Sequence, residues 1–129
     1  KAHLVRAVVE SMALQTRDVV DAMSAHSGRP VASLQVDGGA AVMDLLLQMQ
    51  ADQLGVPVRR PVVQETTALG AAYLAGLAEG VWSSVDDIEA NWALDAEFAP
   101  APDRTAADAL HARWLEAVAR SRGWATTAS

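Results

Sequence analysis

The sequence contains no cysteine. Disulfide bridges and thiolate chemistry are therefore excluded, and the composition suits a reducing compartment, so we expect a cytoplasmic protein. No apolar run of the chain approaches the ~20 residues that a membrane-spanning helix needs, and no segment has the form of a signal peptide. A membrane is therefore not an expected partner.

Basic residues are few and dispersed. The chain has 10 Lys and Arg against 16 Asp and Glu, which gives a formal net charge of −6. Nucleic-acid binding needs a basic surface that neutralises phosphates, so nucleic acid is not an expected partner. The histidines His3, His26 and His111 are too far apart to form a ligand pattern, and no metal site is predicted.

Hydrophobic residues make up 51% of the 129 residues, which is enough for one domain with its own core. Apolar residues recur at helical spacing from the start of the chain and predict a helix over 3–25. Gly28 and Pro30 follow as the signals that end it. Because the chain begins inside this pattern, we expect residues 1–129 to be a single partial domain of a longer protein.

Alternation of strand and helix patterns continues along the chain. The order helix, strand, helix, strand, helix predicts an α/β layer with parallel strands. Prolines flank the second strand, which predicts that it is short or at an edge. Small residues fill the third helix and predict close packing against the sheet or the second helix. The predicted strands are 31–36 and 56–60, the further helices are 41–54, 68–78, 85–91 and 104–122, and residues 95–102 are predicted as an ordered loop.

The most informative local pattern is Asp37-Gly38-Gly39, between an apolar strand and a helix. Backbone N–H groups and the positive end of a helix would meet there, which suits an anion such as a phosphate. Glycine lets a ligand approach the backbone and permits positive φ. Asp-Gly and Gly-Gly are also common hairpin-turn pairs, so a plain turn is the alternative. Asp37 is expected to cap the loop by accepting backbone hydrogen bonds.

Several stretches together resemble the C-terminal part of the sugar and polyol kinases of the FGGY family, nearest to the branch that phosphorylates glycerol. The similarity covers nearly the whole chain up to about Trp114, and the order and spacing of the motifs make it specific. The matching stretches are residues 3–10, 15–19, 36–39, 50–58, 65–76 (ETTALGAAYLAG), 80–82 and 98–100.

This resemblance implies a helix-rich α/β fold with a few strands, the C-terminal portion of an actin-like ATPase (ribonuclease H-like) domain. It also implies transfer of the γ-phosphoryl group from ATP, with Mg²⁺, to glycerol. Gly38 and Gly39 would lie along the nucleotide, and Asp44 is a further candidate nucleotide contact. Placement of the donor is the main task of the protein in phosphoryl transfer. Expected partners are ATP or ADP, glycerol and a preceding part of the protein, and a homo-oligomer is left open.

Two features depart from the family pattern. The family usually has Asn next to the adenine where this chain has Met43, and a thioether cannot replace the hydrogen bonds of an amide. The catalytic carboxylate and polyol-binding residues of the family have no counterpart in this chain. General-base catalysis needs a carboxylate within reach of the acceptor hydroxyl. We therefore predict no catalytic residue here and an inactive isolated chain.

The remaining alternatives are a pentulose kinase of the same family, a non-catalytic interaction module with this fold, and a plain α/β domain.

Trp114 is expected on the buried face of the last helix. Four charged residues are predicted to be solvated: Arg17, Asp18, Arg59 and Arg60. For Arg59 and Arg60 the alternative is that they face a subunit or domain neighbour.

Overall fold

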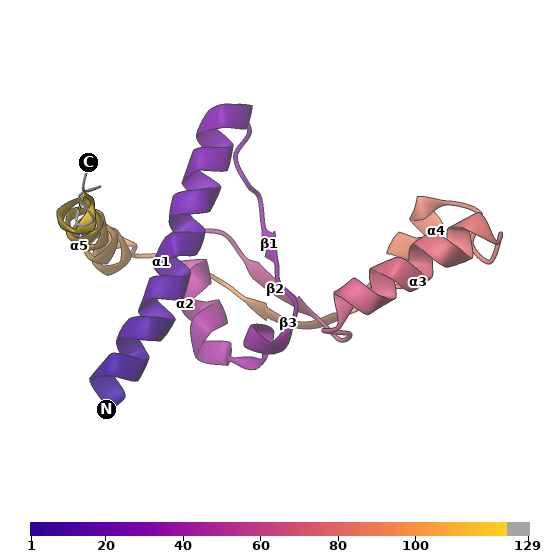
Figure 1. The fold of residues 1–129 in the computed structure, drawn as a ribbon, viewed down its shortest axis with the longest axis horizontal. Coiled ribbons are helices and arrows are strands. Elements are labelled where there is room, and N and C mark those ends of the chain that lie inside the picture. The colour runs from indigo at the N-terminus through magenta and orange to yellow at the C-terminus, as the bar shows by residue number, and fades with distance from the viewer. Residues whose placement is uncertain (124–129) are drawn as a thin grey trace, which may run out of the picture.

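A three-stranded sheet lies at the centre of the fold, which a computed structural model describes for residues 1–123 (Figure 1). The central strand is β2 (Val58–Pro61), with β1 (Leu34–Gln35) parallel to it on one side. On its other side, β3 (Leu94–Phe98) runs antiparallel. The parallel pair confirms the predicted layer, although β1 is shorter than expected. Strand β2 was predicted to be short or at an edge, and it is short, with four residues, although it is the central strand. Pro61 is tolerated there because it is the last residue of the strand, where the register shifts.

Strand β3 replaces the loop predicted over 95–102. The prolines that suggested a loop, Pro100 and Pro102, lie beyond its end. Its outward carboxylates pair across the sheet with β2: Arg59 Nε lies 2.7 Å from Glu97 Oε2, and Arg60 Nε lies 2.7 Å from Asp95 Oδ2. Opposite charges on neighbouring strands stabilise their pairing, and these partners come from segments far apart in sequence.

Two long helices cover one side of the sheet (Figure 1). Helix α1 (Ala2–Ser27) ends at Gly28 with φ 67°, and α2 (Asp44–Leu54) ends at Gly55 with φ 71°. Both glycines adopt the left-handed cap conformation, as Gly28 was predicted to do. The Arg104 guanidinium donates to the carbonyl oxygens of Gln53 and Leu54, at 2.9 and 3.2 Å, and so satisfies the open end of α2.

The hydrophobic core joins α2 to the sheet. Leu47 and Ala51 of α2 are fully buried against Val58 of β2. Helix α1 crosses the other face of α2 and buries Ala13 and Leu14. The partly buried side chains that complete this core are Leu34, Val36 and Phe98.

Helix α5 (Thr105–Ser121) matches the predicted last helix to within one residue at each end. It lies beside α1 and α2, at the opposite end of the molecule from α3 (Figure 1). The sequence after Gly123 predicts fraying over residues 125–129, which lie outside the described part of the chain.

Helices α3 (Thr66–Ala78) and α4 (Val85–Glu89) project away from the sheet, and we call residues 66–90 the arm (Figure 1). A capping box begins α4, as the serines and aspartates at residues 83–87 predict, with Ser84 and Asp87 bonded reciprocally. The packing predicted for α3 is wrong, because its only buried residue is Gly76 and it makes no extensive contact with the sheet or α2. Gly76 lies under the indole of Trp82, which meets the Tyr73 ring edge-on at 5.1 Å.

Candidate functional site

The loop after β1 holds Gly38 in a backbone conformation that only glycine adopts readily. Its φ of 77° and ψ of −179° place it in the region that a Cβ atom disfavours. The loop is fixed on both sides, since Val36 N–H donates to Arg59 O at 3.0 Å and Gly38 N–H to Gln64 O at 2.8 Å. The positive φ expected at this motif is thus confirmed for Gly38, whereas Gly39 has a negative φ.

The backbone after Gly38 forms a 3-10 turn (Gly39–Val42, labelled η1) before α2 begins. The first hydrogen bond of this turn runs from Ala41 N–H to Gly38 O at 3.0 Å. The amides of Gly39 and Ala40 precede that bond, as the first amides of any helix do. A Cβ built at Gly39 meets no atom within 4 Å, so the space beside these amides is open. This geometry suits an anion or the phosphate of a nucleotide.

The expectation that an α-helix opens directly after the glycines is wrong. Helix α2 starts at Asp44, and Met43 is its N-cap with φ −87° and ψ 93°. Met43 carries no side-chain cap, and its carbonyl oxygen accepts from Leu46 and Leu47 N–H at 2.9 and 3.2 Å. The 3-10 turn therefore lies between Gly38 and the N-terminus of α2, where the positive end of the helix dipole is.

Asp44, the candidate nucleotide contact, forms an ion pair within the chain. Its Oδ1 lies 2.8 Å from Arg60 Nη1, which also donates to Ala41 O at 3.0 Å. Arg60 additionally pairs with Asp95 and lies over the Phe98 ring, 5.7 Å from its centroid. The hydrogen bonds with Asp44 and then Asp95 raise the pKa of the Arg60 guanidinium.

Arg60 therefore joins the η1 turn and α2 to strands β2 and β3. Its side chain is only 13% exposed, so the prediction that it is solvated is wrong. This guanidinium fixes the orientation of the segment that follows Gly38 and Gly39. The nucleotide contact assigned to Asp44 stays a prediction, and the ion pair places its carboxylate beside that segment.

Asp37 is exposed, and its carboxylate accepts no hydrogen bond within residues 1–123. The capping role expected for it is therefore not observed. Asp37 instead lines a depression of about 310 Å³ between α1, α2 and the glycine loop. Thr16 and Gln50 line the same depression.

Gln50 presents a buried acceptor at this depression. Thr16 Oγ1 donates its one proton to Met12 O at 2.8 Å and can only accept from Gln50 Nε2 at 3.2 Å. This fixes the amide orientation and leaves Gln50 Oε1 buried without a partner. A buried acceptor of this kind is usually satisfied by an ordered water.

A cluster between α1 and α5 was missed by sequence reasoning. Asp18 Oδ1 lies 2.8 Å from His111 Nε2, and Asp18 Oδ2 accepts from Trp114 Nε1 at 2.7 Å. Burial acts to raise the pKa of Asp18, but the hydrogen bonds from Trp114 and His111 outweigh it and hold that pKa below its usual range. Asp18 was predicted to be solvated, and that prediction is wrong. His111 lies on the face of α5 that meets Asp18.

Arg17 reinforces the same junction. Its Nη1 lies 2.9 Å from Asp108 Oδ1 of α5 and 3.2 Å from Gln53 Oε1 of α2, and its side chain is largely buried, against the prediction of a solvated residue. The residues of this junction are more than thirty positions apart in sequence, and no local pattern marks them. Trp114 does lie on the inward face of α5, as predicted.

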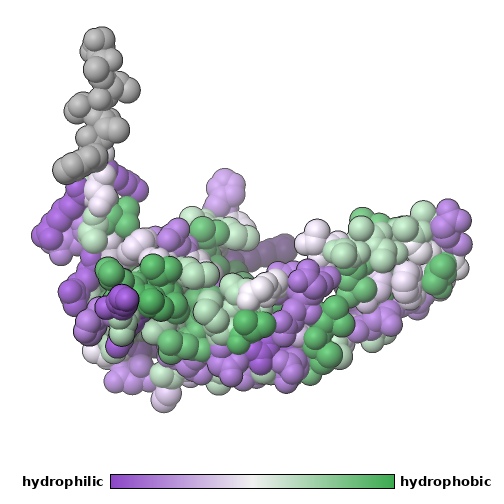
Figure 2. Space-filling model, turned by 60° about the horizontal axis from the view of Figure 1, so that its bottom comes forward, coloured by the Kyte–Doolittle hydropathy of each residue, from purple (hydrophilic) through white to green (hydrophobic). Residues whose placement is uncertain are grey.

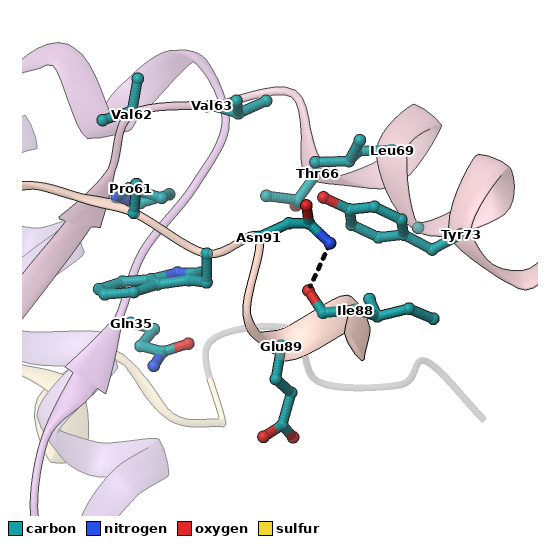
Figure 3. A pocket seen from close by; sticks show the side chains of 13 residues that line it. Gln35, Pro61, Val62, Val63, Thr66, Leu69, Tyr73, Ile88, Glu89 and Asn91 are labelled. Atoms are coloured by element: carbon teal, nitrogen blue, oxygen red, sulfur yellow. Dashed lines mark hydrogen bonds between the residues drawn. The ribbon is translucent and has the colours of Figure 1, made fainter. Parts of the chain in front are cut away.

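A second hollow of about 620 Å³ lies between β2 and the base of the arm (Figure 3). Leu69 and Tyr73 of α3 and Ile88 of α4 point into it, together with Pro61 of β2 (Figure 3). Its lining holds one carboxylate, Glu89, and no histidine or lysine, so it lacks an acid–base pair for catalysis.

Metal ligands are also not gathered in the described residues. No group of three or more His, Asp or Glu side chains among residues 1–123 could hold a metal ion. Over that same range, none of the helices has the length and apolar character to cross a bilayer.

Comparison with known proteins defines the class. The family model described as "FGGY family of carbohydrate kinases, C-terminal domain" matches residues 1–79, and the chain belongs to this family. Solved relatives share the fold and confirm the predicted C-terminal portion of an actin-like ATPase domain. Glycerol kinase of Plasmodium falciparum with ADP aligns with a TM-score of 0.80 at 30% identity, over 93% of this chain and 24% of that one. Xylulose kinase of Rhodospirillum rubrum aligns with a TM-score of 0.75 at 25% identity, over 92% and 24%.

Curated glycerol kinases are similar in sequence to this chain. Glycerol kinase 2 of Thermotoga maritima is 56% identical over 124 residues, 96% of this chain and 25% of the relative. Glycerol kinase of Halobacterium salinarum is 52% identical over 126 residues, 98% of this chain and 25% of the relative. The chain therefore spans about a quarter of the length of the curated relatives that it matches.

Proposed function

We propose that this chain is the C-terminal, nucleotide-side part of an ATP-dependent glycerol kinase. The parent protein would transfer the γ-phosphoryl group of ATP to glycerol and give sn-glycerol 3-phosphate. The observation that carries the proposal is the loop at Gly38 and Gly39, with its glycine-only conformation and open amides, in a chain 56% identical to a glycerol kinase.

The role of this chain in that reaction is to place the donor. The amides of Gly39 and Ala40 would donate to the nucleotide, and the Arg60–Asp44 ion pair would hold the following turn in position. Preorganised donors of this kind lower the barrier without reorganising during the reaction. An ADP-bound glycerol kinase among the structural relatives supports a nucleotide at this fold.

The rest of the machinery is assigned to the preceding part of the parent. Mg²⁺ would neutralise the phosphate charge, and we assign it no ligand in this chain. Glycerol and the general base would also be held by the preceding part. Cytoplasmic location is part of the same proposal, and the absence of cysteine supports it.

Met43 is the feature that sets this chain apart from the family pattern. It lies at the N-cap of α2, four residues after Gly39, and offers no side-chain hydrogen bond to an adenine. Adenine recognition would then rely on backbone groups and on apolar contact with the thioether.

The test is glycerol-dependent ADP release by the full-length parent, with Gly39→Ala as the decisive variant. A Cβ at Gly39 meets no protein atom within 4 Å and Gly39 has a negative φ, so the fold should be unchanged. The methyl group would occupy the proposed nucleotide position, and we expect MgATP affinity to fall by about tenfold or more, roughly 1.4 kcal/mol.

Gly28→Ala is the matched control. Gly28 has φ 67° in open space at the far end of α1, so the substitution strains the backbone but leaves the loop at Gly38 intact. It should lower stability by roughly 1 kcal/mol without changing MgATP affinity. Unchanged affinity in Gly39→Ala would contradict the nucleotide site. Phosphorylation of a pentulose in place of glycerol would identify a pentulose kinase, and no saturable MgATP binding would identify an interaction module.

A further inference from the structure

Helix α3 is apolar on every side, yet it lies almost entirely outside the core. The segment Thr66–Ala78 has no charged side chain, and Gly76 is its only buried residue. Leu74, in its middle, is 70% exposed. A helix at a protein surface normally turns a charged or polar face to water, whereas a helix that is hydrophobic all round is normally buried in protein. The sequence of α3 is thus that of an interior helix.

The exposed apolar surface continues beyond α3. Val81 and Val85 follow it, and Val62 and Val63 lead into it, all of them exposed. Figure 2 shows hydrophobic surface along the arm, at the right of the view. Contiguous apolar patches of this kind mark interaction sites in soluble proteins.

The hollow of Figure 3 lies at the base of this surface and adds depth to it. Its volume of about 620 Å³ would suit a small ligand by itself. Leu74, Val81 and Val85 lie outside its lining, however, so a small molecule that filled the hollow would leave them exposed. The whole surface fits a polypeptide.

The arm also has a uniform charge. Residues 66–90 contain four acidic residues, Glu79, Asp86, Asp87 and Glu89, and no lysine or arginine. Two arms packed against each other would place like charges together, which disfavours that pairing. A complementary partner has an apolar centre with lysine or arginine at its edge.

We propose that the arm is the docking surface for the part of the parent protein that precedes this chain, an inference that rests on the proposed function. The chain covers about a quarter of each relative, and the family model that it matches is that of a C-terminal domain. Those relatives therefore carry a large preceding segment. That segment places apolar side chains in the hollow, covers Leu74 and Val81, and sets basic residues against the acidic edge of the arm.

The base of the arm is tied to the glycine loop. Gln64, two residues before α3, accepts the Gly38 N–H at 2.8 Å. Val62 N–H donates to Ala93 O at 2.9 Å, which joins the segments that lead into and out of the arm. Docking on the arm therefore also fixes the segment before α3 that holds Gly38 in place.

The first test is hydroxyl-radical labelling of the full-length protein. Leu74 is more exposed in this chain than Leu115 of α5, at 70% against 49%. Docking reverses this order, so Leu74 should be labelled several-fold less than Leu115, at every protein concentration. Labelling of Leu74 above Leu115 would overturn the proposal. Protection that disappears on dilution would also overturn it and would identify a second copy as the occupant.

The second test is the melting temperature of full-length variants. Leu74→Asp places a charge in the proposed interface and should lower the melting temperature by at least about 2 °C. Leu74→Met should leave it unchanged, and Leu115→Asp should have a smaller effect than Leu74→Asp. Equal small shifts for both aspartate variants would contradict docking. Neither test requires catalysis, so docking can succeed while the proposed kinase activity fails, and the reverse.

Discussion

The body of the molecule, formed by the sheet with α1, α2 and α5, differs from the arm in how many of its apolar side chains are buried. The body exposes some apolar side chains, such as Leu4 at 74%, but it also buries Leu47 and Val58 to at most 1% exposure. The helices of the arm bury only Gly76, and Leu74 there is 70% exposed. Both regions form helices with recognisable end signals. The arm therefore shows that a segment of this chain can form helices without forming a hydrophobic core.

Charged residues also have different roles in the body and in the arm. In the body, Arg17, Arg59 and Arg60 each pair with an acidic residue from a distant segment. In the arm, the carboxylate of Asp87 caps its own helix by bonding Ser83 and Ser84. The body thus uses charge to join its elements to one another, whereas the arm uses it locally.

The largest effect should come from the core of the body. Leu47→Ala removes a fully buried side chain between α2 and β2 and should lower the free energy of unfolding by about 2–5 kcal/mol. Urea denaturation of this chain measures it. A loss below about 1 kcal/mol would mean that the core does not carry the stability of the body.

The junction between α1 and α5 should come next, and it should depend on pH. Asp18→Asn weakens the bonds to Trp114 and His111 and should cost about 1–2 kcal/mol near neutral pH. Because the folded pKa of Asp18 is lowered, its contribution is present above the ordinary pKa of about 3.9 and is lost as pH falls through the lowered value.

Unfolding free energies between about pH 6 and pH 3 test this sign. The original chain should lose more stability than Asp18→Asn over the acid end of that range. Parallel curves for the two proteins would show that Asp18 titrates normally.

A smaller and local effect is expected at the arm's own cap. Ser84→Ala removes the acceptor for Asp87 N–H and should destabilise α4 by about 0.5–2 kcal/mol. Amide hydrogen exchange should speed up over Val85–Glu89 while global unfolding stays the same. Ser121→Ala at the end of α5 is a control that leaves exchange in α4 unchanged. A matching loss of global stability would mean that the arm folds as one unit with the body.

The smallest effect should occur at the most exposed part of the arm. Leu74→Gln in this chain should change the free energy of unfolding by less than about 0.5 kcal/mol, because the leucine is already exposed. Thermal denaturation of the two chains measures it. A loss similar to that of Leu47→Ala would show that α3 is buried in solution, possible only if another surface covers it.

The elements with local signals were predicted well. Gly28 ends α1 and Ser84 begins α4 because cap chemistry depends on neighbouring residues. The family motifs fixed the position of Gly38 and Gly39 without reference to the structure. Strand β3 was missed because its pairing depends on Arg59 and Arg60, which lie 35 to 38 residues away.

The periodic helices, the glycines that end α1 and α2, and the Asp-Gly-Gly motif can be predicted from the sequence, because each depends on residues that are close neighbours in the chain. The role of Arg60 in joining the turn after Gly39 to two strands, and that of Asp18 in holding α5, depend on tertiary contacts. The position of the apolar helix α3 outside the core depends on tertiary contacts as well. Burial depends on which distant surfaces meet, and no local pattern of residues contains that information.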